Sequence, residues 1–143
     1  MTVARILSLK GRHVVTTHPA RSLREVAEDL VLNRIGAVVV VDDNDEVVGI
    51  VSESDVVKAV AARGADALIE PASHHMAANP PLAREEDPVD DVMETMTRER
   101  RRHIPVWRDG RLAGIVSIGD VVKYRIERIE YEHRALREYI AQG

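Results

Sequence analysis

The pattern of apolar and polar positions in the first half of the chain predicts a helix, a hairpin and a second helix. Apolar side chains recur at helical spacing after Ser22, a suitable helix N-cap, at Leu23, Val26, Ala27 and Leu30. Residues 37–41 and 47–51 are apolar, mainly β-branched runs separated by the turn sequence Asp-Asp-Asn-Asp, which is typical of a hairpin of two buried strands. A second helix is expected to open at Ser52, and a short strand at Val14 to Thr16. The predicted unit is therefore β-α-β-β-α.

The second half of the chain repeats the first. Residues 49–58 read GIVSESDVVK and residues 114–123 read GIVSIGDVVK, with eight of ten positions identical. Upstream, with a shift of one residue, apolar positions also match: Leu23, Val26, Leu30, Val38 and Val40 align with Val89, Val92, Met96, Ile104 and Val106. Similarity of this extent predicts two copies of one structural unit.

We expect an α/β (α+β) fold in which the two β-α-β-β-α repeats pack with pseudo-twofold symmetry. A small sheet with helices on one side leaves apolar surface exposed, and the second copy would cover it. The predicted organisation is residues 1–63 for the first repeat, 64–76 for a linker with one short helix, 77–125 for the second repeat and 126–143 for a C-terminal helical extension.

The C-terminal extension carries a heptad pattern. Its apolar stripe has the spacing 4-3-4-3-4 with His133 as the one polar member: Val122, Ile126, Ile129, His133, Leu136 and Ile140. Such a helix is unstable alone, so the stripe must pack on another surface. One alternative is the chain's own sheet or N-terminal segment, and the other is a contact between molecules, either in a dimer or with a regulated partner that docks there. Of these we expect a contact between molecules, in the form of a homodimer.

Composition narrows the class of protein. The 143 residues are 45% hydrophobic and 31% charged with a net charge of −4, which is typical of a soluble globular chain and implies no nucleic-acid partner. The chain contains no cysteine, which fits a reducing compartment, and we expect it in the cytoplasm. No segment has the apolar length of a signal-peptide core or a membrane span, so no membrane partner is expected.

The repeated motif Gly-Ile-Val-Ser-x-x-Asp lies where a predicted strand turns into a helix. Ser and Asp at this spacing form a capping box, which is a purely structural role. The same helix N-terminus presents free N–H groups and positive dipole character that suit a phosphate, and a carboxylate there can accept both hydroxyls of a ribose. The motif alone therefore allows either interpretation.

In its context the motif resembles that of a tandem pair of cystathionine-β-synthase (CBS) domains, also called a Bateman module. The resemblance spans roughly residues 6–125. Besides the two Ser-x-x-Asp motifs it rests on Lys10-Gly11, Thr16-Thr17-His18-Pro19, Ile35-Gly36-Ala37 and Arg102-His103-Ile104-Pro105-Val106. It implies a cleft between the repeats with up to two sites for adenosine-type ligands.

The resemblance also implies roles for individual residues. The ribose diol would be bound by Asp55 and Asp120. Candidate contacts for phosphate or ribose are Thr16, Thr17, Ser52 and Ser117, with positive charge from Arg102 and His103. The adenine would be flanked by Val14, Ala37 and Ile104. The predicted ligand-binding set is completed by the matching residues Lys10, Gly11, Gly36 and Pro105.

The sequence departs from the family pattern in two places. Ser54 and Gly119 stand before the motif aspartates, where many nucleotide-binding members carry Arg, so the case for a tightly held polyphosphate is weaker. The second repeat also lacks the Lys-Gly and Thr-Thr elements, because the corresponding residues 77–83 read AANPPLA. We therefore expect two unequal sites.

Other candidate chemistry is weaker. The adjacent side chains His74 and His75 point in different directions and have no further ligand nearby in the sequence, so no metal site is expected. The basic residues within 98–102 lack interleaved aromatic residues and are interpreted as a solvated helix end. No nucleophile elbow, glycine-rich phosphate loop or acid/base pair is evident, so we predict no catalytic residue and no enzyme.

The sequence thus predicts a regulatory module, such as an energy-state sensor. It would require no cofactor, bind an adenosine-type regulatory ligand (AMP, ADP, ATP, S-adenosylmethionine or NAD(H)) between the repeats, and signal in trans to a partner protein of unknown identity. The alternative is a ligand-free structural or protein-interaction module that acts through the C-terminal helix.

Overall fold

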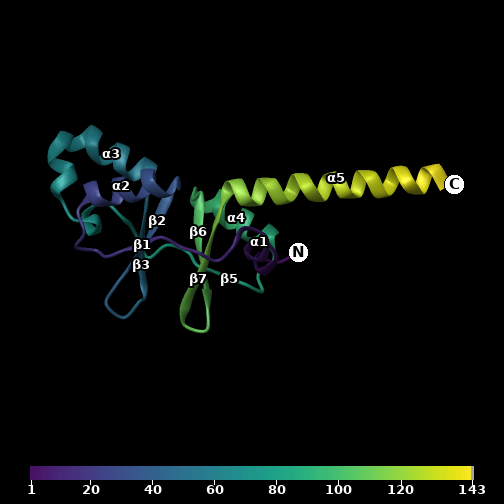
Figure 1. Ribbon diagram of the computed structural model, residues 1–143, viewed down its shortest axis with the longest axis horizontal. Coiled ribbons are helices and arrows are strands. Elements are labelled where there is room, and N and C mark those ends of the chain that lie inside the picture. The colour runs from purple at the N-terminus through teal and green to yellow at the C-terminus, as the bar shows by residue number, and fades with distance from the viewer. Residues whose placement is uncertain (143) are drawn as a thin grey trace.

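The computed structural model describes residues 1–142, and its two halves repeat one arrangement of strands and helices (Figure 1). The elements of the first half are α1 (Val3–Lys10), β1 (Thr16–Thr17), α2 (Leu23–Asn33), β2 (Ala37–Val41), β3 (Val47–Ser52) and α3 (Glu53–Arg63). Two 3₁₀ segments follow, η1 (Gly64–Ile69) and η2 (Ala72–His74). The second half contains β4 (Ala77–Ala78), β5 (Ala83–Arg84), α4 (Val89–Glu99), β6 (His103–Arg108), β7 (Arg111–Ser117) and α5 (Ile118–Gln142). The predicted mixed α/β fold with a long C-terminal helix is confirmed.

Each half has its own sheet, and the strand pairing is repeated. The strand order is β1-β2-β3-β4 in the first sheet and β5-β6-β7 in the second. β1 and β5 run parallel to β2 and β6, and the two hairpins are antiparallel. Ala37 pairs with Ser52 and His103 pairs with Ser117, so each hairpin begins opposite the serine of the repeated motif. The duplication therefore extends to the register of individual strands.

Two local features differ from the sequence-based expectation. The first strand is Thr16–Thr17, so it begins two residues later and ends one residue later than expected, because Thr16 and Thr17 are the residues that pair with Val39 and Val40 of β2. The connection between the halves contains two 3₁₀ segments where one short helix was expected. Pro71 lies between these segments in an extended conformation, which interrupts any continuous helix.

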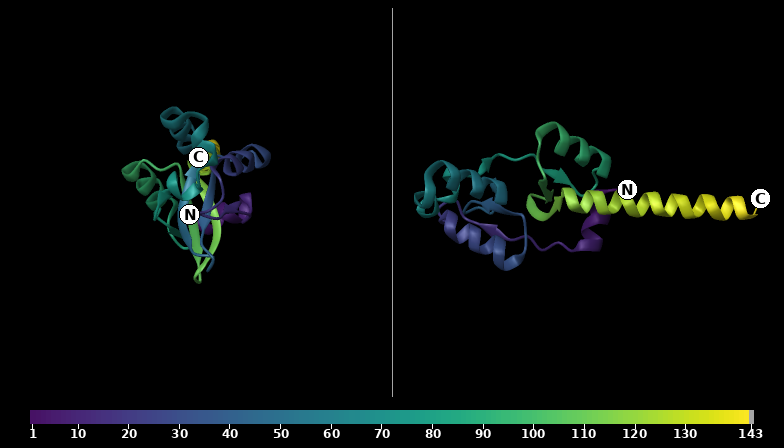
Figure 2. Two further views of the ribbon diagram at one scale, coloured as in Figure 1. Left: turned by 90° about the vertical axis from the view of Figure 1, so that its left-hand side faces the viewer. Right: turned by 90° about the horizontal axis from the view of Figure 1, so that it is seen from above.

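Two segments cross over between the halves. Residues 3–10 were assigned to the first repeat without a predicted helix, but they form α1, and its side chains Val3, Ile6 and Leu7 are buried in the core of the second repeat. Residues 77–78 were assigned to the second repeat, but they form β4 at the edge of the first sheet, next to β3. Figures 1 and 2 show α1 with the second repeat rather than beside α2, and it packs against β7 and the base of α5. Each repeat is therefore completed by a segment from beyond its own predicted boundary.

The glycines of the repeated motif allow these crossing segments to approach. Gly114 of β7 lies under Leu7 of α1, and a Cβ at Gly114 would lie 2.7 Å from Cδ2 of Leu7. Gly49 of β3 lies under the side chain of Met76, the residue that precedes β4, and a Cβ at Gly49 would clash with that side chain. The first residue of the repeated motif therefore has a packing role in both halves.

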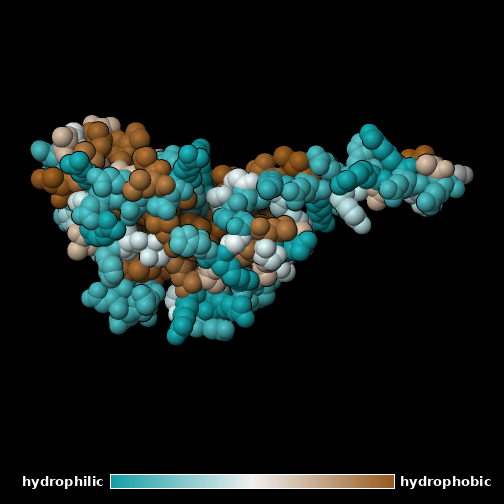
Figure 3. Space-filling view, viewed as in Figure 1, coloured by the Kyte–Doolittle hydropathy of each residue, from teal (hydrophilic) through white to brown (hydrophobic). Residues whose placement is uncertain are grey.

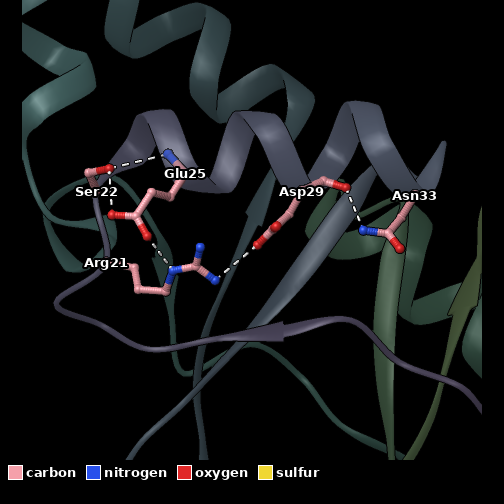
Figure 4. A network of polar contacts seen from close by, with 5 residues as sticks. All are labelled: Arg21, Ser22, Glu25, Asp29 and Asn33. Atoms are coloured by element: carbon pink, nitrogen blue, oxygen red, sulfur yellow. Dashed lines mark hydrogen bonds and ion pairs between the residues drawn. The ribbon is translucent and has the colours of Figure 1, made fainter.

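A polar network runs along α2 from the turn that precedes it (Figure 4). The predicted cap is confirmed, since Ser22 Oγ accepts a hydrogen bond from Glu25 N at 3.2 Å. Arg21 donates to Glu25 at 2.7 Å and to Asp29 at 3.3 Å, and the bond from Arg21 holds the pKa of Glu25 below its ordinary value. Ala72 N donates to Arg21 O at 2.7 Å, which ties η2 to the same turn.

Helix α5 begins at the second motif and leaves the body as one helix of 25 residues (Figures 1 and 2). Val121 and Tyr124 are buried in the second core, whereas every described residue from Arg125 onward is exposed. The apolar stripe predicted from the heptad spacing is thus uncovered, and Figure 3 shows apolar side chains along this helix. In the structure the stripe packs neither on the chain's own sheet nor on its N-terminal segment. Gly143, the last residue of the predicted extension, lies outside the described residues.

Among the described residues, no helix combines the length and the apolar character needed to cross a bilayer.

Candidate functional site

The two Ser-x-x-Asp motifs cap the helices α3 and α5. Asp55 Oδ2 accepts hydrogen bonds from Ser52 N at 2.9 Å and Ser52 Oγ at 3.0 Å, while Asp55 N lies 3.3 Å from Ser52 Oγ. In the second repeat Asp120 Oδ2 accepts from Ser117 N at 2.9 Å, and Ser117 Oγ accepts from Asp120 N at 3.2 Å. The structural capping role is thus present twice. It fixes each carboxylate at the positive end of a helix dipole.

The two aspartates differ in their further partners. Lys10, the last residue of α1, donates to Asp120 Oδ2 at 2.6 Å and to the carbonyl oxygen of Ile115 at 2.8 Å. Within residues 1–142, the hydrogen bonds to the Asp55 carboxylate come from Ser52 alone. The carboxylate of the second repeat is therefore already paired with a cation, and that of the first is not.

The contacts of Asp120 set its protonation state. Burial of the carboxyl would raise its pKa, but the hydrogen bonds from Lys10 and from Ser117 more than offset this and hold the pKa below its ordinary value. Asp120 is therefore ionised at neutral pH. A group that displaces Lys10 must itself satisfy a partly buried negative charge.

The repeats meet where the two hairpins begin. Gly36, just before β2, lies against the imidazole of His103, and a Cβ at Gly36 would lie 3.0 Å from Nε2 and 3.8 Å from Oε1 of Glu53. Gly36 and Glu53 belong to the first repeat and His103 to the second. Each repeat has an equivalent backbone hydrogen bond between the start of its hairpin and the start of the helix that follows. Glu53 N donates to Gly36 O at 3.0 Å, and Ile118 N donates to Arg102 O at 2.8 Å.

Charged groups gather around His103 at this junction. Burial lowers the pKa of His103, and Lys10 lowers it further, while Asp120 and Glu53 act in the opposite direction. The imidazole is therefore neutral at pH 7 and lies close to both cations and carboxylates. This combination offers acceptors for hydroxyl groups and cations for an anionic group.

The other predicted site residues fall into two groups. Gly11, Thr16 and Arg102 are exposed and Val14 is half-buried. The buried members are Thr17, Ala37, Ile104 and Pro105. Ile104 is 1% exposed and packs in the second core. Thr17 is 2% exposed, and its Oγ1 has no hydrogen-bond partner within residues 1–142.

Two features of the junction had no signal in the sequence. Glu53 was not predicted, because its equivalent in the second repeat is Ile118 and comparison of the repeats gives it no prominence. Lys10 was predicted only through the family resemblance. Its contact with Asp120 joins residues 110 positions apart and depends on α1 lying with the second repeat.

No group of three or more histidine, aspartate or glutamate side chains converges as a metal site in the described part of the chain. Two grooves lie on the helices of the first repeat. One, of about 500 Å³, runs between α2 and α3 and is lined by Val31, Ile35, Val56 and Val57, reaching Glu53 at one end.

The arrangement agrees with known proteins. The model of the CBS domain family matches residues 7–62 and 72–127. The crystal structure of a CBS-domain protein from Agrobacterium tumefaciens is 48% identical, with a TM-score of 0.83 over 87% of this chain and 92% of that one. A curated but uncharacterised protein of Acidianus ambivalens is 32% identical over 77% of this chain, and the alignment spans 66% of that protein's length.

Two similar structures contain adenosine compounds. A CBS domain protein from Pyrobaculum aerophilum, complexed with AMP, is 32% identical with a TM-score of 0.76 over 84% of this chain and 89% of that one. The CBS domain pair of protein MJ0100, in complex with 5′-methylthioadenosine and S-adenosyl-L-methionine, is 28% identical with a TM-score of 0.80 over 90% of this chain and 98% of that one. CBS-domain pairs are in general regulatory rather than catalytic. With two matched repeats and the pair fold, this chain belongs to the CBS domain family as a tandem CBS-domain pair.

Proposed function

We propose that this protein is a regulatory module that binds an adenosine-type ligand at the junction between its repeats and signals in trans to a partner protein. The observation that carries the proposal is the placement of Asp55 and Asp120 at two helix N-termini, with Lys10 and His103 beside the second. A carboxylate can accept both hydroxyls of a ribose, and a helix N-terminus with nearby cations suits a phosphate. The adenosine compounds bound by similar CBS-domain pairs support the same ligand class.

The two sites are proposed to differ in the ligand they prefer. At Asp120 a ribose would replace Lys10 on the carboxylate, and the freed ammonium would need a new anionic partner. A ligand with a phosphate or carboxylate supplies that partner, whereas plain adenosine does not. At Asp55 no cation has to be displaced, so charge on the ligand matters less there.

A signalling route follows from the position of the second site. Asp120 lies in the first turn of α5, so a ligand there would act on the base of a helix of 25 residues. A ligand that contacts both repeats would favour one relative orientation of them, and α5 would carry that change outward. The proposal includes a homodimer through α5, no enzymatic activity and no required cofactor. The cytoplasmic location stays a prediction.

A thermal-shift panel with AMP, ADP, ATP, S-adenosylmethionine and NAD(H) tests the ligand. A compound at 100 times its Kd stabilises the folded state by about 2.7 kcal/mol. At least one compound should raise the Tm, and the shift should be lost in Asp55→Asn or Asp120→Asn. Asp91→Asn, an exposed position on α4, is the matched control and should keep the shift.

A second candidate function is a ligand-free interaction module that acts through α5. The observation that favours it is the Lys10–Asp120 pair, which already satisfies one of the two carboxylates. A panel with no shift for the wild-type protein would support this candidate and contradict the first.

A further inference from the structure

We propose that the exposed part of α5 pairs with α5 of a second copy as a parallel, in-register, two-stranded coiled coil. This inference rests on the homodimer included in the proposed function and does not depend on ligand binding. It adds the orientation and register of the two helices.

The apolar stripe of α5 points away from its own body. Val121 and Tyr124 pack in the second core, and Arg125 binds Asp90 of α4 at 3.0 Å, so these residues mark the side of α5 that faces the body. At 3.6 residues per turn, the centre of the apolar stripe is rotated about the helix axis by roughly a third of a turn from the side that faces the body. Its larger members remain open to solvent, with Ile129 56% and Leu136 57% exposed. A second helix can therefore approach the stripe along the whole protruding length.

The composition of the stripe suits two strands. In heptad notation the a positions are Ile126, His133 and Ile140, and the d positions are Val122, Ile129 and Leu136. Ile at a with Leu at d favours two strands, and Ile140 with Leu136 forms this combination. One polar residue among the a positions fixes the register and the number of helices. In a parallel pair His133 faces His133 of the second copy, where two imidazoles can share a hydrogen bond. A shifted register would place each imidazole against an isoleucine instead.

The charges beside the stripe select the parallel orientation. The g positions include Arg125 and Glu132, and the e positions include Glu130 and Arg137. In a parallel pair each g residue faces the e residue of the next heptad in the other helix. Arg125 then meets Glu130 of the second copy, and Glu132 meets Arg137 of the second copy. Twofold symmetry repeats both contacts, so every one of these pairs is attractive.

The antiparallel arrangement with full overlap brings like charges together. There g positions face g positions and e positions face e positions, so Glu132 meets Glu132 of the second copy and Glu130 meets Glu130 of the second copy. Lys123 at the third e position would meet Arg137 of the second copy. Two of the residues involved have exposed partners within their own chain, since Arg125 binds Asp90 and Glu132 binds Arg128 at 3.2 Å. Exposed pairs of this kind are weak and do not prevent contacts to a second helix.

A single introduced cysteine tests the orientation, because the wild-type chain contains none. With Leu136→Cys in the full-length protein, a parallel pair places the two sulfur atoms together at a d position, and mild oxidation should give a disulfide-linked dimer on a non-reducing gel. In the antiparallel pair residue 136 meets residue 126, and no such dimer forms. Glu138→Cys, on the outward side of the helix, is the matched control and should cross-link far less.

A charge exchange tests the same contact without removing an apolar residue. Glu132→Arg and Arg137→Glu should each weaken the dimer about tenfold, since each turns two attractive contacts into repulsive ones. The double variant restores opposite charges and should recover the wild-type Kd in sedimentation equilibrium. Arg134→Glu, at an outward b position, should leave the Kd unchanged.

The outcomes separate the orientation from the proposals on which it rests. A wild-type dimer by mass, without cross-linking at residue 136 and without rescue in the double variant, would overturn the parallel pairing but not the homodimer. A wild-type monomer at all concentrations tested would overturn both. Neither result bears on the ligand panel, which tests the nucleotide site separately.

Discussion

Lys10 Nζ lies 2.6 Å from Asp120 Oδ2, so the end of the first helix is joined to the start of the last one. The pair closes the second repeat with a residue from outside its predicted boundary. It also occupies the carboxylate that is proposed to receive a ribose. Structural and ligand-binding roles therefore meet in one ion pair, and substitutions there affect both.

Lys10→Met should raise the pKa of Asp120. The hydrogen bond and the positive charge that lower this pKa would be lost, while the burial that raises it would remain. An NMR titration of the Asp120 carboxyl measures the change. Lys58→Met removes a positive charge from an exposed position on α3 and should leave the pKa unchanged. An unchanged pKa in Lys10→Met would show that the ion pair does not persist in solution.

His103 should make the protein less stable at mildly acidic pH. Burial lowers its pKa below 6.5, so the unfolded chain binds a proton more readily than the folded one. This contribution to stability is complete above pH 6.5 and is lost as the pH falls through and below that value. The free energy of unfolding should therefore fall less between pH 7.5 and pH 5.5 in His103→Gln than in the wild type. Exposed His13, replaced by Gln, is the control, and an equal fall in all three proteins would contradict the prediction.

Gly114→Ala should destabilise the protein by about 1–3 kcal/mol, the usual cost of overpacking a filled core. The new Cβ would meet Cδ2 of Leu7 at 2.7 Å, and Leu7 is 1% exposed, so its side chain has little room to move. Leu7→Ala alone should cost about 2–5 kcal/mol through the cavity that it leaves.

The double variant Gly114→Ala with Leu7→Ala measures whether these two residues interact directly. Its loss of stability in urea unfolding should be clearly smaller than the sum of the two single losses, because the added methyl group fills part of the cavity. Additive losses would indicate that Leu7 does not rest on Gly114.

Gly36→Ala tests the junction between the repeats. A Cβ there would lie 3.0 Å from Nε2 of His103 and push the imidazole off its preferred rotamer, at a cost of about 1 kcal/mol. In the background of His103→Ala the same change should cost almost nothing, as measured by the difference in Tm. A cost that persists without the imidazole would mean that the backbone at Gly36, and not the contact between repeats, is responsible.

The sequence was sufficient to predict what depends on local pattern. The hairpins, the cap at Ser22 and the helix that opens at Ser52 follow from the spacing of apolar residues and from side chains three positions apart. Because the second half of the sequence repeats the first, the same order of strands and helices was predicted there. The long α5 was predicted for the same reason, since its heptad stripe is continuous.

The crossing segments could not be predicted from pattern alone. The apolar residues of α1 indicate that the helix needs a surface to cover, but the two repeats offer nearly equivalent surfaces. The choice between them depends on the path of residues 11–15, which carry no periodicity. The contact of Lys10 with Asp120 follows from that choice. The proximity of Glu53 to His103 depends instead on how the two repeats pack, so both became visible only in three dimensions.

The crossing of α1 and β4 bears on how such a protein can be divided. A fragment cut between α3 and β4 separates α1 from the core it covers and leaves the first sheet without its outer strand. Neither piece would carry the complete set of residues that its own fold uses. The smallest portion that can be transferred to another protein, or expressed by itself, is therefore the whole pair from Val3 to Tyr124.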